Sequence, residues 1–90
     1  MSTQSPLEAT LLSVLDTLGA EKSACPTDVA RAFAQGDSDP EAWRRHLSAV
    51  RRAAVRLAEA GRIEILRKGK PVPPAEMRGV IRLRIRPEGA

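Results

Sequence analysis

The sequence predicts an α+β fold in which three helices precede a small antiparallel β-sheet. Two patterns predict this fold. Apolar residues recur every three or four positions as far as Gly61, as on one face of a helix, and then alternate with charged residues, as in a strand. Glycine or proline stands at each predicted boundary. The chain of 90 residues predicts one domain, residues 1–90, with a thin core and an ordered part at about 5–86.

The first helix is predicted to begin at Ser5 and to end before Gly19. Ser5 can cap the free amides of the first turn, Pro6 suits the first helical position, and Glu8 can complete a capping box. Apolar residues at helical spacing form its inner face: Leu7, Leu11, Val14, Leu15 and Leu18. Gly19 is expected to end the helix because glycine readily adopts a left-handed backbone.

A short extended segment and a second helix are predicted next. Residues from Glu21 to Cys25 are expected to pair as a brief strand. Pro26 opens the second helix, and Asp28 lies in its first turn, where an acid suits the helix dipole. The apolar face of this helix is formed by Val29, Ala30 and Phe33. Gly36 is expected to stop the helix.

The third helix is predicted to run from Pro40 to Ala60. Its apolar stripe consists of Trp43, Leu47, Val50, Ala54, Leu57 and Ala58. A break near Leu47–Ser48 is an alternative, because Ser48 could cap a fresh start. The phase of Trp43 predicts that its ring fills the core against the first or second helix. Truncation of a buried ring of this kind to alanine costs about 3–5 kcal/mol.

Two strands are predicted after the third helix. The first runs through Ile63 and Ile65, and a loop and one helical turn, residues 69–79, separate it from the second. The second strand alternates apolar with basic side chains: Ile81, Arg82, Leu83, Arg84, Ile85 and Arg86. Because the two strands are consecutive, we expect them to pair antiparallel. The order helix, short strand, helix, helix, strand, loop, strand is that of the winged helix-turn-helix fold.

Several stretches of the chain carry a family resemblance. They are Cys25-Pro26-Thr27-Asp28-Val29-Ala30-Arg31, Trp43, Leu47, Val50-Arg51, Gly61-Arg62-Ile63-Glu64-Ile65, Lys68-Gly69-Lys70-Pro71-Val72 and Gly79-Val80-Ile81-Arg82-Leu83. Over most of residues 24–84 the chain resembles a bacterial family known only as a domain of unknown function, DUF3253. The resemblance implies a stand-alone winged helix domain and no particular activity. More loosely, residues 57–63 look like the helix-to-wing junction of the winged helix-turn-helix DNA-binding superfamily.

Composition narrows the classes of protein that remain. A single cysteine, Cys25, excludes an internal disulfide, and one cysteine with one histidine excludes the usual four-ligand zinc site. No cofactor is predicted, because Gly69-Lys70 lacks the rest of a phosphate-binding loop. The sequence has neither a signal peptide nor a run of about 18 apolar residues, so we expect a cytoplasmic protein with no membrane partner.

The sequence predicts a protein that is not an enzyme. His46 lies at the edge of the apolar stripe, with no nucleophile that can be paired with it, and is expected to be structural. Four acids cluster near helix starts, where capping explains them: Asp28, Asp37, Asp39 and Glu41. Cys25, at the cap of the second helix, is expected to be a small and mostly buried residue. A redox-sensing thiolate is the alternative for it.

Charge is divided unequally along the chain. Residues 1–42 carry two basic and seven acidic side chains, a net charge of −5, whereas residues 43–90 carry thirteen basic and four acidic ones, a net charge of +9. Such a distribution attracts anions to one half of the molecule. Together with the fold, it predicts duplex DNA as the partner. The alternatives are a protein partner or homodimer, in which the acidic half meets a basic surface, and RNA.

The predicted DNA contacts lie on the third helix and on the loop between the strands. Arg45, Ser48 and Arg52 are expected to face bases or the groove wall, because arginine can bind the two acceptors of guanine. The residues expected to hold phosphates are Arg44, Arg56, Lys68 and Lys70. The alternative for the helix is a solvated face. Arg84 and Arg86 are expected instead to protect an exposed strand from aggregation.

Overall fold

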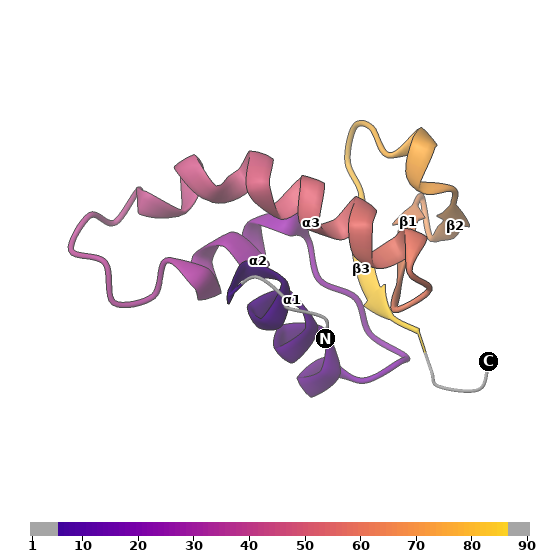
Figure 1. The fold of residues 1–90 in the computed structure, drawn as a ribbon, viewed down its shortest axis with the longest axis horizontal. Helices are drawn as coiled ribbons and strands as arrows, with labels where there is room; N and C mark the ends of the chain where they lie inside the picture. The colour runs from indigo at the N-terminus through magenta and orange to yellow at the C-terminus, as the bar shows by residue number, and fades with distance from the viewer. Residues whose placement is uncertain (1–5, 87–90) are drawn as a thin grey trace.

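The computed structural model describes residues 6–86 as three α-helices, two short 3-10 helices and a three-stranded sheet (Figure 1). The elements are α1 (Pro6–Leu18), α2 (Pro26–Phe33), η1 (Ala42–His46), α3 (Leu47–Glu59), β1 (Ile63–Arg67), β2 (Lys70–Val72), η2 (Pro74–Glu76) and β3 (Arg82–Ile85). The predicted cap Ser5 lies outside the described residues. Within them, no helix is both long enough and apolar enough to cross a membrane.

The end of α1 and the start of α2 confirm the predictions made from glycine and proline, whereas α2 ends at Phe33 with Ala34 as its cap, before the predicted stop at Gly36. Gly19 follows α1 with a φ of +86°, the left-handed conformation expected there. Cys25 caps α2 with an extended backbone, and its amide N–H donates to Asp28 Oδ2 at 3.1 Å. Asp28 thus satisfies a donor at the helix start. Glycine, proline and capping residues act through neighbours a few positions away, so the sequence alone is sufficient to place these ends.

The predicted single helix from Pro40 to Ala60 is wrong, and the alternative break is found. The 3-10 helix η1 precedes α3, which begins at Leu47 with His46 as its cap. The proposed capping role of Ser48 is therefore not realised. The tighter winding of a 3-10 helix changes the phase of the side chains that it carries. As a result Ala42, which is 1 % exposed, occupies the inward position at this end of the molecule.

Trp43 is half-buried and packs at the margin of the core, which corrects the prediction that its ring fills the core. The guanidinium groups of two arginines lie over its ring, with the Cζ of Arg31 4.9 Å and the Cζ of Arg44 4.8 Å from its centroid. The shift in phase at η1 explains the difference, because the neighbouring Ala42 points inward instead. The contacts with the ring combine dispersion with cation–π attraction.

The sheet has the strand order β2-β1-β3, and both pairings are antiparallel. Ile65 of β1 stands between Val72 and Leu83 in the register. Ala24 and Leu83 also exchange two backbone hydrogen bonds of 2.8 and 2.7 Å, so the predicted pairing of residues 21–25 is found at one position, Ala24, whereas Glu21 lies in a turn. Strand β2 was not predicted, because Pro71 argues against a strand. Pro71 is tolerated because β2 is an edge strand, so that the missing N–H of proline removes no hydrogen bond between strands.

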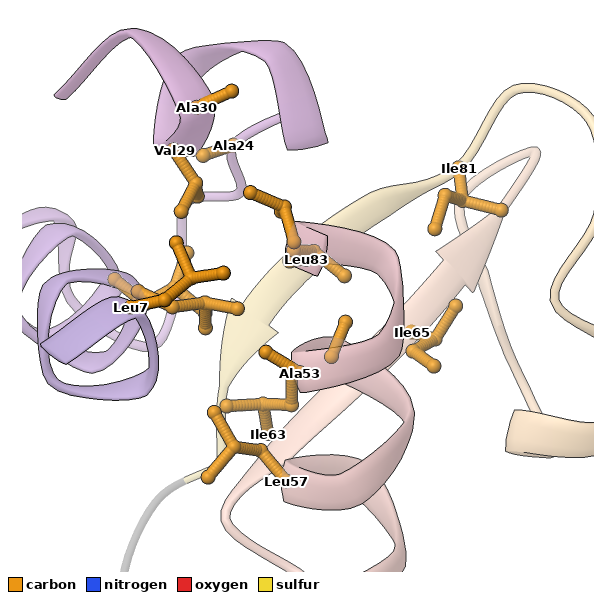
Figure 2. Packing of buried hydrophobic residues seen from close by; sticks show 14 residues of the cluster. Leu7, Ala24, Val29, Ala30, Ala53, Leu57, Ile63, Ile65, Ile81 and Leu83 are labelled. Carbon is orange, nitrogen blue, oxygen red and sulfur yellow. The ribbon is translucent and has the colours of Figure 1, made fainter. Parts of the chain in front are cut away.

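The core lies between the three α-helices and the inner face of the sheet (Figure 2). Its buried members are Leu7, Leu11, Leu15, Ala24, Val29, Ala30, Val50, Ala53, Ala54, Leu57, Ile63, Ile65, Ile81 and Leu83. Ile81 and Leu83 are buried whereas Arg82 between them is exposed, so the predicted alternation in the last strand is confirmed. The apolar face of the sheet thus closes onto the helices. This packing stabilises strands that would be marginal on their own.

The architecture is α+β, with three α-helices and a three-stranded antiparallel sheet in the described residues, as predicted. It is compatible with a winged-helix-like arrangement. In Figure 1 the sheet and the loop after β2 lie at one end of α3, and the turn between α2 and η1 lies at the other end. The two ends carry different sets of charged side chains.

Candidate nucleic-acid interface

The exposed face of α3 carries Ser48 and Arg52. Val50, Ala54 and Leu57 of the same helix are buried, so the residues on its opposite side face solvent. Ser48 and Arg52 are exposed and lie about one turn apart. Among residues 6–86, no acidic side chain forms an ion pair with Arg52. These two predicted residues are accessible to a ligand.

Arg56 lies at the margin of this face and is engaged with α1. Its Nε donates to Glu8 Oε2 at 2.6 Å. The side chain of Arg56 is 54 % exposed, whereas that of Glu8 is only 13 % exposed, so the carboxylate is partly withdrawn from water. The pair joins α1 to α3. A phosphate that binds Arg56 would have to displace this carboxylate, and we expect little gain from the exchange.

Arg44 and Arg45 lie on η1 and face acids of the preceding turn. We call residues 36–41, which include Asp37, Asp39 and Glu41, the acidic turn. Arg44 Nε lies 2.6 Å from Glu41 Oε1. Arg45 Nη2 lies 2.8 Å from Asp37 Oδ2, and its Nη1 lies 3.9 Å from Asp39 Oδ2. Both arginines were predicted to contact DNA, but the structure sets them before α3, beside carboxylates that already compensate their charge.

Asp37 of the acidic turn has a lowered pKa. The amide N–H of Asp39 donates to Asp37 Oδ1 at 2.9 Å. This hydrogen bond and, after it, the guanidinium of Arg45 hold the pKa of Asp37 below its ordinary value of 3.8. Burial acts in the opposite direction and does not overcome them. At neutral pH Asp37 is therefore ionised and available to Arg45.

The turn between β1 and β2 presents the basic residues of the wing. We call Arg67, Lys68, Gly69 and Lys70 the wing tip. Lys68 has a φ of +53° and Gly69 a φ of +80°, so both central residues of this two-residue turn have positive φ, as in a type I′ hairpin. Asparagine or aspartate is the residue type that usually precedes glycine in such a turn, because a lysine there is strained.

The basic side chains of the wing tip have no acidic partners. Arg67 and Lys70 stand opposite each other in the register of β1 and β2, next to Lys68. All three are exposed, as is Arg78 in the following loop. None of the four forms an ion pair with a described residue. The wing tip therefore concentrates uncompensated positive charge at one end of the molecule.

The outward-facing arginines of β3 make contacts within the fold. Arg84 donates to Glu64 Oε1 through Nε and Nη2, at 3.0 and 2.6 Å, across the pair that the two residues form in the sheet. Arg82 donates to Ser23 Oγ at 2.7 Å and to the Ser23 carbonyl oxygen at 2.9 Å. The contact with Glu64 gives Arg84 a structural role, in keeping with its exclusion from the predicted DNA contacts.

His46 packs against an aromatic ring, and Cys25 lies at a helix cap. The ring of His46 meets that of Phe33 edge to face, with centroids 5.0 Å apart. Cys25 is a half-buried free thiol at the cap of α2. Within residues 6–86, no three histidine, cysteine, aspartate or glutamate side chains gather in a way that could hold a metal ion.

The seven predicted site residues fall into three groups. Lys68 and Lys70 lie together at the wing tip, Ser48 and Arg52 lie on the exposed face of α3, and the other three are held by carboxylates: Arg44, Arg45 and Arg56. Arg67 belongs with the wing tip although it was not among the predicted contacts. A two-residue turn that ends in glycine is a sequence signal for a hairpin. Lys68-Gly69 is such a turn, and this signal could have placed Arg67 opposite Lys70.

The described residues form a small α+β protein that is compatible with a winged-helix-like arrangement and has exposed basic side chains at the sheet end. The family model described as a protein of unknown function, DUF3253, matches residues 4–86, and the chain belongs to this family. No functionally curated protein matches the chain.

Proposed function

We propose that this chain is a non-enzymatic domain that binds duplex DNA through the wing tip and the exposed face of α3. The distribution of unpaired cations carries the proposal. Arg67, Lys68 and Lys70 of the wing tip and Arg52 of α3 are exposed and have no acidic partner among the described residues. Phosphate groups bind such cations with release of counterions, so these four side chains are the main expected contacts.

The backbone at Lys68 supports a role for its charge. A residue other than glycine in the left-handed region costs about 1–2 kcal/mol. Asparagine would lower this cost, and lysine offers the turn no hydrogen bond that offsets it. Strain that a substitution could relieve is commonly kept where a side chain has a function. The side chain of Lys68 is well placed to meet a phosphate, since it lies at the tip of an exposed hairpin.

The environment of the aromatic residues favours a duplex over a single strand. Proteins that bind single strands usually stack bases on exposed aromatic rings. The chain contains one tryptophan, one phenylalanine and no tyrosine. Two guanidinium groups lie over the ring of Trp43, and Phe33 packs against His46. Neither ring offers a free face at the wing tip. In a helix-turn-helix arrangement, the exposed face of the third helix instead enters the major groove.

The test is fluorescence anisotropy of a labelled random duplex at low and moderate salt. The wild type is compared with a Lys68→Gln/Lys70→Gln variant and with a matched Arg44→Gln/Arg45→Gln variant, which removes the same charge from η1. We expect the wing variant to bind at least about tenfold more weakly, and the η1 variant to bind within about twofold of the wild type. Four phosphate contacts predict a slope of log affinity against log salt of about −4.

Three results would contradict the proposal. A salt slope near zero would show that phosphates are not the ligand. Equal losses in the two variants would show that affinity follows net charge and that the wing tip is no site. A single-stranded competitor that displaces the duplex at equal nucleotide concentration would reject the preference for a duplex.

A further inference from the structure

A hollow with a volume of about 480 Å³ lies between the wing tip and the segment that leads into β3. Two apolar side chains line it, Leu66 and Val80. Leu66 is only 6 % exposed but is not part of the main core cluster. It alternates in β1 with Ile65, whose side chain faces that core, so Leu66 belongs to the outer face of the sheet. The hollow thus has an apolar floor of its own.

Val80 is held in an exposed position. Its side chain is 90 % exposed, although it is large and apolar. On one side of it, Arg51 of α3 donates to the carbonyl oxygen of Gly79 at 3.2 Å. On the other side, Ile81 is 2 % exposed and Arg82 is joined to Ser23 by two hydrogen bonds. Val80 therefore projects from a segment that is anchored at both ends.

The charges around the hollow are all positive. Arg67, Lys68 and Arg82 line it, and no acidic residue of the described chain does. The contacts of Arg82 with Ser23 are made to a hydroxyl and a carbonyl oxygen, so they leave its net charge uncompensated. An occupant complementary to this surface carries an apolar group for the floor and carboxylates for the rim.

We infer that this hollow docks a segment of a partner protein in which acidic residues flank a bulky apolar side chain. The apolar side chain would cover Leu66 and Val80, and the carboxylates would meet Arg67 and Lys68. A phosphate backbone would use the cations but would leave the exposed side chain of Val80 without an apolar partner. This inference goes beyond DNA binding. The hollow shares Lys68 with the proposed DNA contact, whereas Val80 is specific to docking.

The test uses amide NMR spectra of isotope-labelled protein and a peptide pool in which glutamate alternates with leucine, isoleucine or phenylalanine. One matched pool replaces the apolar residues with serine and threonine, and another replaces glutamate with lysine. We expect saturable shifts at the amides of Val80 and Arg82 with the acidic apolar pool alone. Val80→Ser should weaken this binding about tenfold, because the contact of one valine is lost. Val55→Ser on α3 is the control and should leave the peptide affinity unchanged.

Several outcomes would overturn the inference. They are the absence of saturable shifts at millimolar peptide, equal binding by the serine and threonine pool, and equal binding by the Val80→Ser variant. If duplex DNA shifts the Val80 and Arg82 amides and Val80→Ser weakens its binding, the hollow belongs to the DNA interface instead. Loss of peptide binding in Val80→Ser with unchanged duplex affinity supports docking. If the duplex does not bind, the comparison of peptide binding between the wild type and Val80→Ser can still be made. The two proposals can therefore fail separately.

Discussion

The two ends of the molecule are both rich in basic residues, but they differ in whether these residues are paired with carboxylates. At one end, the acidic turn supplies carboxylates to Arg44 and Arg45. At the other end, the side chains of Lys68 and Lys70 have no acidic partner in the described chain. An arginine held by a carboxylate gains little from a phosphate, because one contact replaces another. Pairing, and not the number of basic residues, therefore distinguishes a candidate anion site from a neutralised surface.

The two ends should also differ in how much their packing stabilises the fold. Leu83 is fully buried between the sheet and the helices, whereas Trp43 is half-buried beside the acidic turn. We expect Leu83→Ala to lower the free energy of unfolding by about 3–4 kcal/mol and Trp43→Ala by about 2 kcal/mol. Denaturant unfolding followed by circular dichroism measures both. A larger loss at Trp43 than at Leu83 would show that the turn end, and not the sheet end, anchors the core.

The fold could be predicted from the sequence wherever the signal is local. Periodicity and the residues around Gly19, Pro26 and Gly61 locate the helices and the first strand, because each acts on the backbone within a few positions. The break before Leu47 was only an alternative, since no proline or glycine marks it. Strand β2 was missed because Pro71 argues against a strand unless the edge position is already known.

The candidate site could be predicted only in part. Ser48, Lys68 and Lys70 are exposed as the sequence indicated. The pair of Arg56 with Glu8 joins positions 48 residues apart, and no sequence pattern predicts such a contact. The pair of Glu41 with Arg44 has i,i+3 spacing and could have been foreseen. Sequence thus gives the candidates, and the tertiary contacts decide which of them remain unpaired.

Neutralising the acidic turn should make its end resemble the wing end. Asp37→Asn with Asp39→Asn keeps an amide oxygen that can accept the backbone hydrogen bonds but removes the partners of Arg45. We expect affinity for a random duplex at low salt to rise about three- to tenfold. The control Asp16→Asn/Glu21→Gln changes net charge equally at exposed sites. If both variants gain the same affinity, the carboxylates do not compete for Arg45.

Relieving the strained backbone at the wing tip should separate stability from binding. Lys68→Asn places a residue that tolerates the left-handed region at a φ of +53°, and we expect the free energy of unfolding to rise by about 0.5–1 kcal/mol. The same change removes a cation, so duplex affinity should fall. Lys70→Asn is the control, because it removes a cation from β2 without relieving strain. Thermal unfolding and anisotropy of the two variants provide the readouts. A Lys68→Asn variant that is less stable and binds normally would contradict both expectations.

The smallest expected effect is on the titration of Asp37. Its pKa lies below 3.8, and the hydrogen bond from the amide of Asp39 is the largest single cause of this shift, ahead of each of the two contributions of Arg45. Because the pKa is lowered in the folded state, the contact stabilises the fold at pH values above the ordinary pKa of aspartate. This stabilisation is lost as the pH falls through the lower pKa of the folded state. NMR titration of the carboxyl group should therefore show that Arg45→Gln raises the pKa of Asp37 only part of the way to its ordinary value. A complete return in Arg45→Gln would show that the guanidinium, and not the backbone of the acidic turn, lowers the pKa of Asp37.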